Sequence, residues 1–457
     1  MVNMTDNFKT IFKNNKQEAI IEIEEDIKYS DMEEKVLFSR GHTGEKFDLN
    51  GSLDEDEFQR LMIWCVKNKV SDVTIQSGEP VWCEIGGKKE KVTQKIITHP
   101  EIIRLSQIIY GDNAPSELNS GNDLDPSYEV KEQEDIPGKA ERKKIIGRWR
   151  FRVNITTGRM IGGDSYSLTI RTLPSQPIEI SKLGIEDDII KHLRPAQGMN
   201  LFTGPTGSGK STLMSSVLRY LCEKNGEDEP GEKVLEYASP IEFVYDGLAF
   251  PRSVIHQSEV GKHIRSQDPN ISDWTWCIRN ALRRKPDIIS IGEARDKETI
   301  KECIKGASTG HLVMSTMHTI GVAETIRRAV IEFPSQEQVG VAADLLDILN
   351  LVVTQLLIPR KGGGKIGCRE YMVFDKKARS ALLGLNLELW PSRIRELLFS
   401  KQVIGSSMAD SARKLLEQDE ITPETFEWIS NRSSNESSLV RHAIARGLIK
   451  HKKIDSQ

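Results

Sequence analysis

The stretch "MNLFTGPTGSGKSTLMSSVLRYL", residues 199–221, decides the fold of the larger part of this 457-residue chain. It opens with an apolar run typical of a buried strand, and its later apolar residues recur with the spacing of one helix face. Between the two lies "GPTGSGKS", residues 204–211, which has the spacing of a phosphate-binding P-loop. Strand, glycine-rich loop and helix in this order predict an α/β domain that binds a nucleotide.

The P-loop pattern gives each of its residue types a task. Glycines let backbone N–H groups close around phosphate oxygens, and the N-terminus of the following helix adds partial positive charge. Lys210 is predicted to neutralise charge on the β- and γ-phosphates, and Ser211 is predicted to ligand Mg²⁺. ATP and Mg²⁺ are therefore the predicted cofactors. The predicted nucleotide-binding residues are Gly204, Pro205, Thr206, Gly207, Ser208, Gly209, Lys210, Ser211 and Thr212.

Two glutamates follow predicted strands of the same domain. Glu242 lies just beyond the apolar stretch 233–237, and Glu293 lies just beyond 288–291. In parallel sheets the carboxyl ends of the strands carry the ligand site, so these carboxylates are placed to activate water or to hold the metal. Either glutamate alone is more often a solvated loop residue, but a P-loop in the same domain favours the catalytic interpretation.

Patterning along the chain predicts two domains. From residue 181 to about 375, short apolar runs alternate with amphipathic helical patterns, which favours an α/β domain with a largely parallel sheet. Residues 51–174 predict a smaller α+β domain that begins with a helix, because Ser52 and Glu55 have the spacing of a capping box. Within it, residues 111–145 are polar and turn-rich and predict a surface excursion between strands.

The remaining segments are assigned from composition. Residues 1–50 are charged and weakly periodic, which favours an accessory, disordered arm. Pro174 and Pro177 interrupt both helix and strand, which places a linker at residues 175–180. Residues 376–457 predict a helical C-terminal region that ends in a basic stretch.

Composition excludes several classes of protein. The formal net charge of -4 gives no electrostatic basis for bulk nucleic-acid binding, so sequence-specific nucleic-acid binding is not expected. The 6 cysteines are scattered without metal-binding spacing, which is typical of a reducing compartment. Because the sequence contains no signal peptide and no run near the ~20 apolar residues that span a bilayer, membrane contact is expected to be peripheral.

Two histidines, His311 and His318, stand at the ends of the apolar run "LVMSTM". In a continuous strand their rings lie roughly 23 Å apart, so one metal ion cannot bind both. Three hypotheses remain at this point: part of a catalytic dyad, residues that report a change elsewhere in the domain, or hydrogen-bonded structural histidines.

Four stretches carry a family resemblance. "GPTGSGKST", "SPIEFVYD", "PDIISIGEARD" and "TGHLVMSTMHT" resemble the Walker A, Asp box, Walker B and His box of the secretion and type IV pilus ATPases, the superfamily of the pilus retraction motor. The resemblance covers roughly residues 70–375, since "SDVTIQSGEPV" and "WRFRVNI" are similar to that superfamily's PAS-like N-terminal domain. It implies a RecA-like P-loop ATPase domain with a helical C-terminal extension.

The resemblance also implies roles for individual residues. Glu242 would be the catalytic base, Glu293 the Walker B glutamate that holds water or Mg²⁺, and His311 and His318 sensors of the nucleotide state. The N-terminal domain of the superfamily donates arginines to a neighbouring subunit, which suggests Arg152 and Arg171 here. From alternation alone, these strand arginines are more often a solvated face.

The segments "SPIEFVYD", "NALRRKP" and "GVAET" most resemble those of the Dot/Icm ATPase of type IVB secretion and its relative in IncI-type conjugation. Ala238 and Ser239 replace the Glu and Asp of the pilus-motor Asp box, and serine here resembles the Dot/Icm group. The resemblance implies a homo-hexameric Mg-ATPase, cytoplasmic and peripherally attached to the bacterial inner membrane through secretion or conjugation components.

Three alternatives stay open from the sequence. The first is a pilus retraction motor, the second a nucleotide-binding scaffold without turnover, and the third a small-molecule P-loop kinase. The sequence does not identify the cargo, which is DNA or protein.

Overall fold

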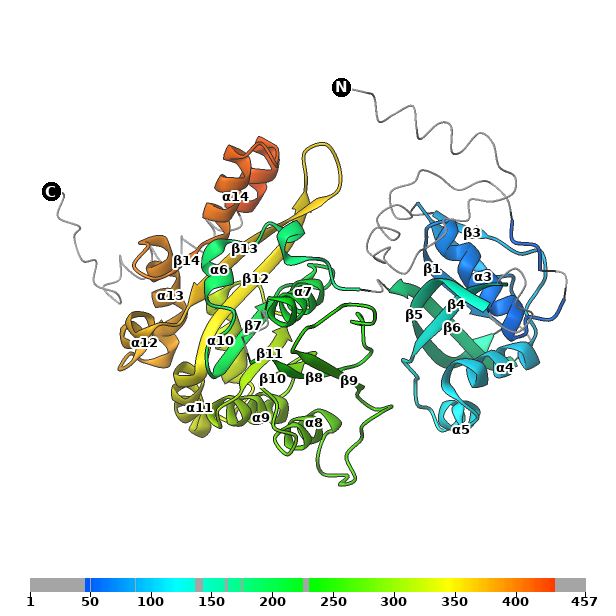
Figure 1. Cartoon of the computed structure of the whole chain (residues 1–457), viewed down its shortest axis with the longest axis horizontal. Helices are drawn as coiled ribbons and strands as arrows, with labels where there is room; N and C mark the ends of the chain where they lie inside the picture. Colours follow the sequence, from blue (N-terminus) through cyan, green and yellow to red (C-terminus); the bar gives the residue numbers. More distant parts are fainter. Residues whose placement is uncertain are drawn as a thin grey trace. The chain divides into compact units, whose positions relative to one another are not determined.

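The computed structural model describes residues 46–49, 51–86, 88–135, 143–160, 163–173, 176–224 and 230–431 (Figure 1). The chain divides into two compact units, Met1–Ser175 and Gln176–Gln457, each with its own sheet. The predicted mixed α/β class is therefore confirmed. Most of the predicted N-terminal arm, Pro174, Ser175 at the start of the predicted linker and the basic C-terminal stretch lie outside the described residues.

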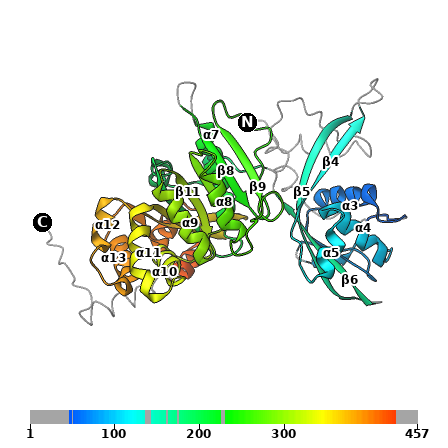
Figure 2. The ribbon, with the colours of Figure 1, turned by 90° about the horizontal axis from the view of Figure 1, so that it is seen from below.

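Unit 1 is an antiparallel six-stranded sheet, in the order β3-β2-β1-β6-β5-β4, that buries one face against helices (Figures 1 and 2). Its strands are β1 (Val70–Gln76), β2 (Trp82–Ile85), β3 (Lys88–Lys91), β4 (Ser127–Asp135), β5 (Lys143–Met160) and β6 (Gly163–Leu173). Its helices are α3 (Glu55–Lys67), α4 (His99–Tyr110) and α5 (Ala114–Asn119). Strands β5 and β6 alternate apolar residues toward the helices with polar residues on the other face, as period-2 strands do.

Helix α3 has the predicted apolar face but not the predicted cap. Its buried residues are Phe58, Leu61, Met62, Cys65 and Val66, as the helical spacing indicates. The N-cap is Asp54, whose carboxylate accepts from the Glu57 N–H at 3.0 Å, so the predicted capping box at Ser52 is wrong. The Ser52 hydroxyl instead donates to the Glu101 carboxylate at 3.2 Å.

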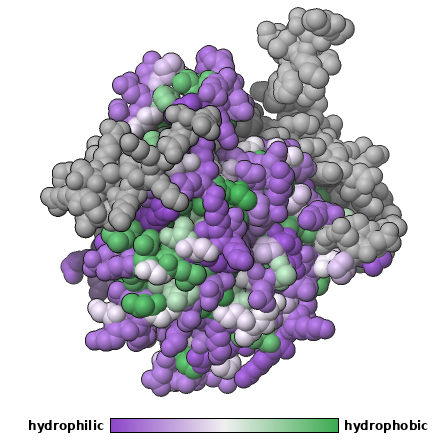
Figure 3. Space-filling view, turned by 90° about the vertical axis from the view of Figure 1, so that its left-hand side faces the viewer, coloured by the Kyte–Doolittle hydropathy of each residue, from purple (hydrophilic) through white to green (hydrophobic). Residues whose placement is uncertain are grey.

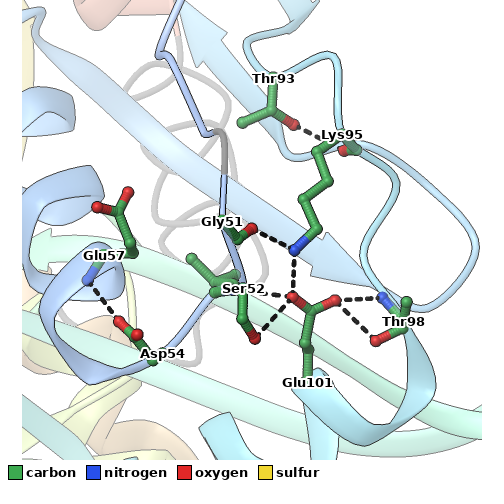
Figure 4. Close-up of polar contacts among 9 residues, drawn as sticks. Gly51, Ser52, Asp54, Glu57, Thr93, Lys95, Thr98 and Glu101 are labelled. Carbon is green, nitrogen blue, oxygen red and sulfur yellow. Dashed lines mark hydrogen bonds and ion pairs between the residues drawn. The ribbon is translucent and has the colours of Figure 1, made fainter.

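Glu101 ties the starts of α3 and α4 together (Figure 4). Its two carboxylate oxygens accept from the backbone N–H groups of Leu53 at 2.8 Å and Thr98 at 2.9 Å, and the Lys95 ammonium lies against it. Burial alone would raise the pKa of Glu101, but the Lys95 ammonium and these N–H donors outweigh it and lower the pKa to about 2. The carboxylate is therefore a structural anion of this unit.

The polar stretch 111–145 is more structured than predicted. It contains helix α5 and strand β4, which pairs with β5 along nine residues' length from Ser127 to Asp135. The prediction of a surface excursion is wrong for this part, because pairing with β5 and the buried Val130 support a strand that carries little apolar pattern of its own.

Unit 2 is built on an eight-stranded sheet in the order β14-β13-β12-β7-β11-β10-β8-β9, parallel from β12 to β9 (Figure 1). Its strands are β7 (Gly198–Thr203), β8 (Lys233–Ala238), β9 (Val254–Glu259), β10 (Ile288–Ile291), β11 (Leu312–Met317), β12 (Leu349–Pro359), β13 (Lys365–Val373) and β14 (Gly405–Ser406). All residues of β7, β10 and β11 are buried, as expected for parallel strands covered on both faces.

Helices cover both faces of this sheet. Its helices are η1 (Ile180–Leu183), α6 (Asp187–Lys191), α7 (Lys210–Glu223), α8 (Asp273–Ala281), α9 (Lys297–Ser308), α10 (Val322–Ile331), α11 (Ser335–Ile348), α12 (Lys376–Leu382), η2 (Leu387–Leu389), α13 (Trp390–Phe399) and α14 (Met408–Glu417). One core joins the sheet to α6 and α7, and a second joins its other face to α8–α13. Because β7, β8, β10 and β11 run parallel, their carboxyl ends meet at one edge of the sheet.

Two further features concern surface and core. All six cysteines are buried, and burial raises the pKa of the thiols of Cys65, Cys222, Cys277, Cys303 and Cys368. Within the described ranges, each helix is too short or too polar to cross a bilayer.

Replacing Glu101 by glutamine tests the role of this anion. Because the pKa of Glu101 is depressed, its stabilisation of unit 1 is fully present above pH 4.5 and is lost as the pH falls toward 2. Glu101→Gln should therefore cost about 3 kcal/mol at pH 7 and progressively less below pH 4.5. Amide hydrogen exchange of α3 and α4 in the full chain, compared at matched pH, measures this.

The control is Glu117→Gln, since the Glu117 carboxylate accepts an exposed hydrogen bond from Asn122. That change should stay within about 0.5 kcal/mol. Equal exchange in wild type and Glu101→Gln at pH 7 would contradict the proposed role of Glu101.

Candidate functional site

The P-loop lies at the carboxyl edge of the unit 2 sheet, between β7 and α7. Gly204, Gly207 and Gly209 have φ values of 151°, 76° and 76°, in the region that favours glycine. A Cβ on Gly204 would lie 2.4 Å from both the Gln355 carbonyl oxygen and the Ser208 hydroxyl. The loop therefore closes tightly against the neighbouring strand β12, and only glycine fits at its start.

Lys210, His318 and Glu293 form a continuous polar row at this edge. The Lys210 ammonium is 3.4 Å from Nδ1 of His318, and Nε2 of His318 is 3.6 Å from a Glu293 carboxylate oxygen. Because the ammonium donates to Nδ1, His318 carries its proton on Nε2, the nitrogen that faces Glu293. The structure thus brings together residues from α7, from the loop after β11 and from the loop after β10.

The Lys210 ammonium lies in a partly dehydrated environment. Burial lowers the pKa of the Lys210 ammonium, and the carboxylates of Glu293 and Glu242 act against this by favouring the charged form. Both predicted glutamates therefore lie close enough to act electrostatically on the P-loop lysine. Lys210 itself is 8% exposed.

The loop that carries Glu242 is fixed by a side chain that sequence analysis missed. The Gln257 amide on β9 donates to the Phe243 carbonyl at 2.8 Å and to the Glu236 carboxylate at 2.7 Å. Gln257 therefore connects the residue next to Glu242 to strand β8. Its neighbourhood gave no motif, because the pairing of β9 with β8 is set by tertiary structure.

A chain of buried threonines lies under the P-loop and was also missed. The hydroxyl of Thr203, the last residue of β7, is 2.7 Å from that of Thr354 and accepts from Thr325 at 3.4 Å. The Thr325 hydroxyl is 2.6 Å from Thr319, the residue after His318. These bonds join the start of the P-loop to the loop that carries His318.

The other predicted site residues lie elsewhere. His311 is at the amino end of β11, where its carbonyl accepts from the Gly198 N–H at 3.0 Å and its ring is 3.3 Å from the Thr309 hydroxyl. Within unit 1, Arg152 and Arg171 face each other across β5 and β6. Nε of Arg152 donates to Asp125 at 3.1 Å, and Nε of Arg171 donates to Asp72 at 2.8 Å.

The residues of the P-loop fit a phosphate group. The Ser208 hydroxyl is buried and makes no hydrogen bond to the described residues, so a polar group in the loop lacks a partner. Lys210, the first residue of α7, supplies a buried cation beside it, and the half-buried Ser211 follows it in the first turn. Bound Mg²⁺ would supply charge neutralisation between phosphate oxygens, held by Ser211 and Glu293.

In the described part of the chain, His, Cys, Asp and Glu side chains form no group of three or more that could hold a metal ion by themselves. Ser211 and Glu293 supply only part of a ligand set, as is usual where phosphate and water oxygens complete the shell.

A separate concave region lies between α10, α11 and the start of α13. It encloses about 360 Å³ and is lined by apolar residues that include Ile326, Val330, Val339 and Trp390. Val339 is 72% exposed at its rim. Apolar side chains form green groups between purple ones on the side shown in Figure 3. None of the predicted site residues lines this pocket.

The comparisons with known proteins define the class. Residues 116–382 match the family described as "Type II/IV secretion system protein". This match covers more than half of the chain, so the chain belongs to the type II/IV secretion ATPase superfamily, and the predicted resemblance is confirmed.

The chain is similar both to a DotB ATPase and to pilus retraction ATPases. The structure of the ATPase DotB of Legionella pneumophila is 37% identical, covers 84% of this chain and 98% of its own, and superposes with a TM-score of 0.72. The type IV pilus retraction ATPase PilT of Pseudomonas aeruginosa is 31% identical over 71% of this chain and 85% of its own length. A structure of the retraction motor PilT with bound ADP is 26% identical, covers 81% of this chain and 96% of its own, and superposes with a TM-score of 0.64.

Gly204→Ala tests the closure of the P-loop. The added Cβ cannot clear the Gln355 carbonyl and the Ser208 hydroxyl, so the loop must open. We expect this to cost about 3 kcal/mol in nucleotide binding, a rise of about 100-fold in the Kd for Mg-ADP. Titration with a fluorescent ADP analogue measures it.

Gly310→Ala is the matched control. Gly310 also has a positive φ, 96°, but its Cβ would have its nearest contact at 3.9 Å, and it lies at the other end of β11. Affinity should stay unchanged in this variant. Wild-type affinity in Gly204→Ala would show that the loop does not need its observed closure.

Proposed function

We propose that this chain is a Mg²⁺-dependent ATPase that works as a homo-hexameric ring. It would power a type IVB secretion or conjugative DNA-transfer apparatus from the cytoplasmic side of the bacterial inner membrane, to which it attaches peripherally. The observation that carries the proposal is the row of Lys210, His318 and Glu293 at the P-loop edge, with the Glu242 charge close by.

Each of these residues has a task in the proposed hydrolysis. Lys210 binds and neutralises terminal phosphate oxygens, and Glu242 accepts a proton from the attacking water. Glu293 orients water or the metal. His318, whose two ring nitrogens face Lys210 and Glu293, changes its hydrogen bonds when either partner turns toward the phosphate. His311, at the other end of β11, would relate that change to packing.

The proposed domains follow the sequence assignment. Residues 51–174 would be a PAS-like domain, residues 175–180 a linker, and residues 181–375 a RecA-like ATPase domain. The helical region from 376 onward would serve contacts with the apparatus.

The type IVB assignment is supported by the DotB structure at 37% identity over 84% of the chain. A pilus retraction motor is the second candidate, favoured by the PilT sequence at 31% identity. Restored twitching when this chain replaces a retraction motor would favour the second candidate, and restored substrate transfer in a secretion mutant would favour the first.

Glu242→Gln tests the proposed base. The neutral amide cannot accept the proton of water, so kcat should fall about 100-fold or more, while the Kd for Mg-ATP stays within about threefold. Phosphate release and binding by a fluorescent analogue measure the two quantities. Glu298→Gln, an exposed carboxylate on α9, should leave both unchanged. Retained turnover in Glu242→Gln would remove Glu242 from the mechanism.

Subunit mixing tests whether Arg152 and Arg171 act on a neighbour's nucleotide. A double variant, Arg152→Ala with Arg171→Ala, and Glu242→Gln should each be inactive alone. When the two variants are mixed in equal amounts, half of the sites keep Glu242, and half of those have a neighbour that keeps both arginines. The mixed rings should therefore regain about a quarter of wild-type activity. Arg159→Ala, at the far end of β5, is the control for loss of an arginine from this strand. Absence of recovery would place the arginines outside the trans mechanism.

A further inference from the structure

The first segment of unit 2, residues 176–186, is held by three side-chain contacts to elements that also carry the nucleotide site. Gln176 donates to the Asp246 carbonyl at 2.6 Å, four residues beyond the proposed base. Arg219 on α7 donates to the Pro177 carbonyl at 2.7 Å. The third contact, through Arg369, reaches the P-loop itself. This segment is also the point at which unit 1 joins unit 2 in the sequence.

Arg369 on β13 holds the turn between η1 and α6. Its guanidinium donates to the carbonyls of Leu183 at 2.8 Å and Gly184 at 3.0 Å, and to the Glu186 carboxylate at 3.3 Å. The side chain is 2% exposed, so these bonds form away from solvent. A buried guanidinium with backbone acceptors fixes the position of the turn that supplies them.

Gln355 on β12 connects Arg369 to the P-loop. Its amide oxygen accepts from Nε of Arg369 at 2.8 Å, and its amide nitrogen donates to the Ser208 carbonyl at 2.8 Å. Its amide nitrogen would also lie 3.0 Å from a Cβ on Gly209. The two ends of one buried amide therefore contact the P-loop and the guanidinium, and neither can move far without changing the other.

We propose that Gln355 and Arg369 are positioning residues that couple the P-loop to the turn at residues 183–186. The proposal rests on the proposed nucleotide binding. When phosphate binding shifts the Ser208 carbonyl, Gln355 follows to keep its bond, and Arg369 transfers the change to the carbonyls of Leu183 and Gly184. The unpartnered Ser208 hydroxyl gives the loop a reason to shift, because a buried polar group gains a partner in doing so.

The coupling is reciprocal. If nucleotide binding stabilises the turn, then holding the turn must raise nucleotide affinity by the same factor. Forces on the N-terminal unit, which is attached at the start of this segment, would thereby alter how tightly the P-loop holds its nucleotide.

Two variants of Gln355 separate coupling from packing. Gln355→Glu keeps the size of the side chain and its acceptor for Arg369 but removes the donor to Ser208. Gln355→Met removes both polar ends at similar volume. Asn350→Ala is the matched control, because the Asn350 amide donates to the Gln197 carbonyl at 2.9 Å on the same strand but at the other end of the sheet.

Amide hydrogen exchange of the full-length chain, with and without saturating Mg-ADP, measures the coupling. In wild type and Asn350→Ala, Mg-ADP should slow exchange in residues 183–186 by about fivefold or more, together with the P-loop. In both Gln355 variants the P-loop should still be protected at saturation, whereas the protection of 183–186 disappears. The Kd for Mg-ADP should rise by the same factor that is lost at the turn.

Two results would overturn the coupling alone, and a third would also overturn the proposed nucleotide site. If Mg-ADP protects residues 183–186 as strongly in Gln355→Glu as in wild type, the coupling is excluded. It is also excluded if Mg-ADP protects the P-loop of the wild type but leaves exchange at the turn unchanged. Absence of protection at the wild-type P-loop would instead overturn the proposed nucleotide site, and the coupling with it.

Discussion

The candidate site of unit 2 depends on one ammonium group, that of Lys210, which is buried at the edge of the sheet. Lys210 sits at the N-terminus of α7, where the helix itself presents positive charge, so its burial needs compensation from outside the helix. That compensation comes from the lone pair of His318 and from two carboxylates, Glu242 and Glu293, in the loops that follow β8 and β10. Because these groups lie in the loops after β8, β10 and β11, the order of strands in the sheet is what brings them to the lysine.

The parts of this arrangement that follow from local chemistry were predictable from the sequence. The P-loop spacing, the buried strands and the apolar face of α7 are properties of contiguous residues, and the structure has each of them. Glu293 was predictable because it directly follows a short apolar strand. The strand order that brings Glu293 to His318, and through it to Lys210, could not be predicted from the sequence, because it is a property of the tertiary fold.

What the sequence could not supply were contacts between distant residues with no pattern of their own. Gln257, Gln355 and Arg369 are ordinary polar residues on strands until the sheet places them against the Asp-box loop and the P-loop. The predicted cap of α3 was wrong because Asp54, an equally good capping residue, lies two residues further on and accepts from the Glu57 N–H. Ser52 instead donates to Glu101, 49 residues away, a contact that local capping patterns do not contain.

The burial of every cysteine has a practical consequence for experiments on movement. Thiol reagents attack the thiolate, and a buried thiol with a raised pKa presents little of it at neutral pH. A cysteine introduced on the surface should therefore be labelled selectively in the native chain, without first removing the six natural thiols. Fluorophores or spin labels attached in this way can report distance changes within either unit while the natural core packing is retained.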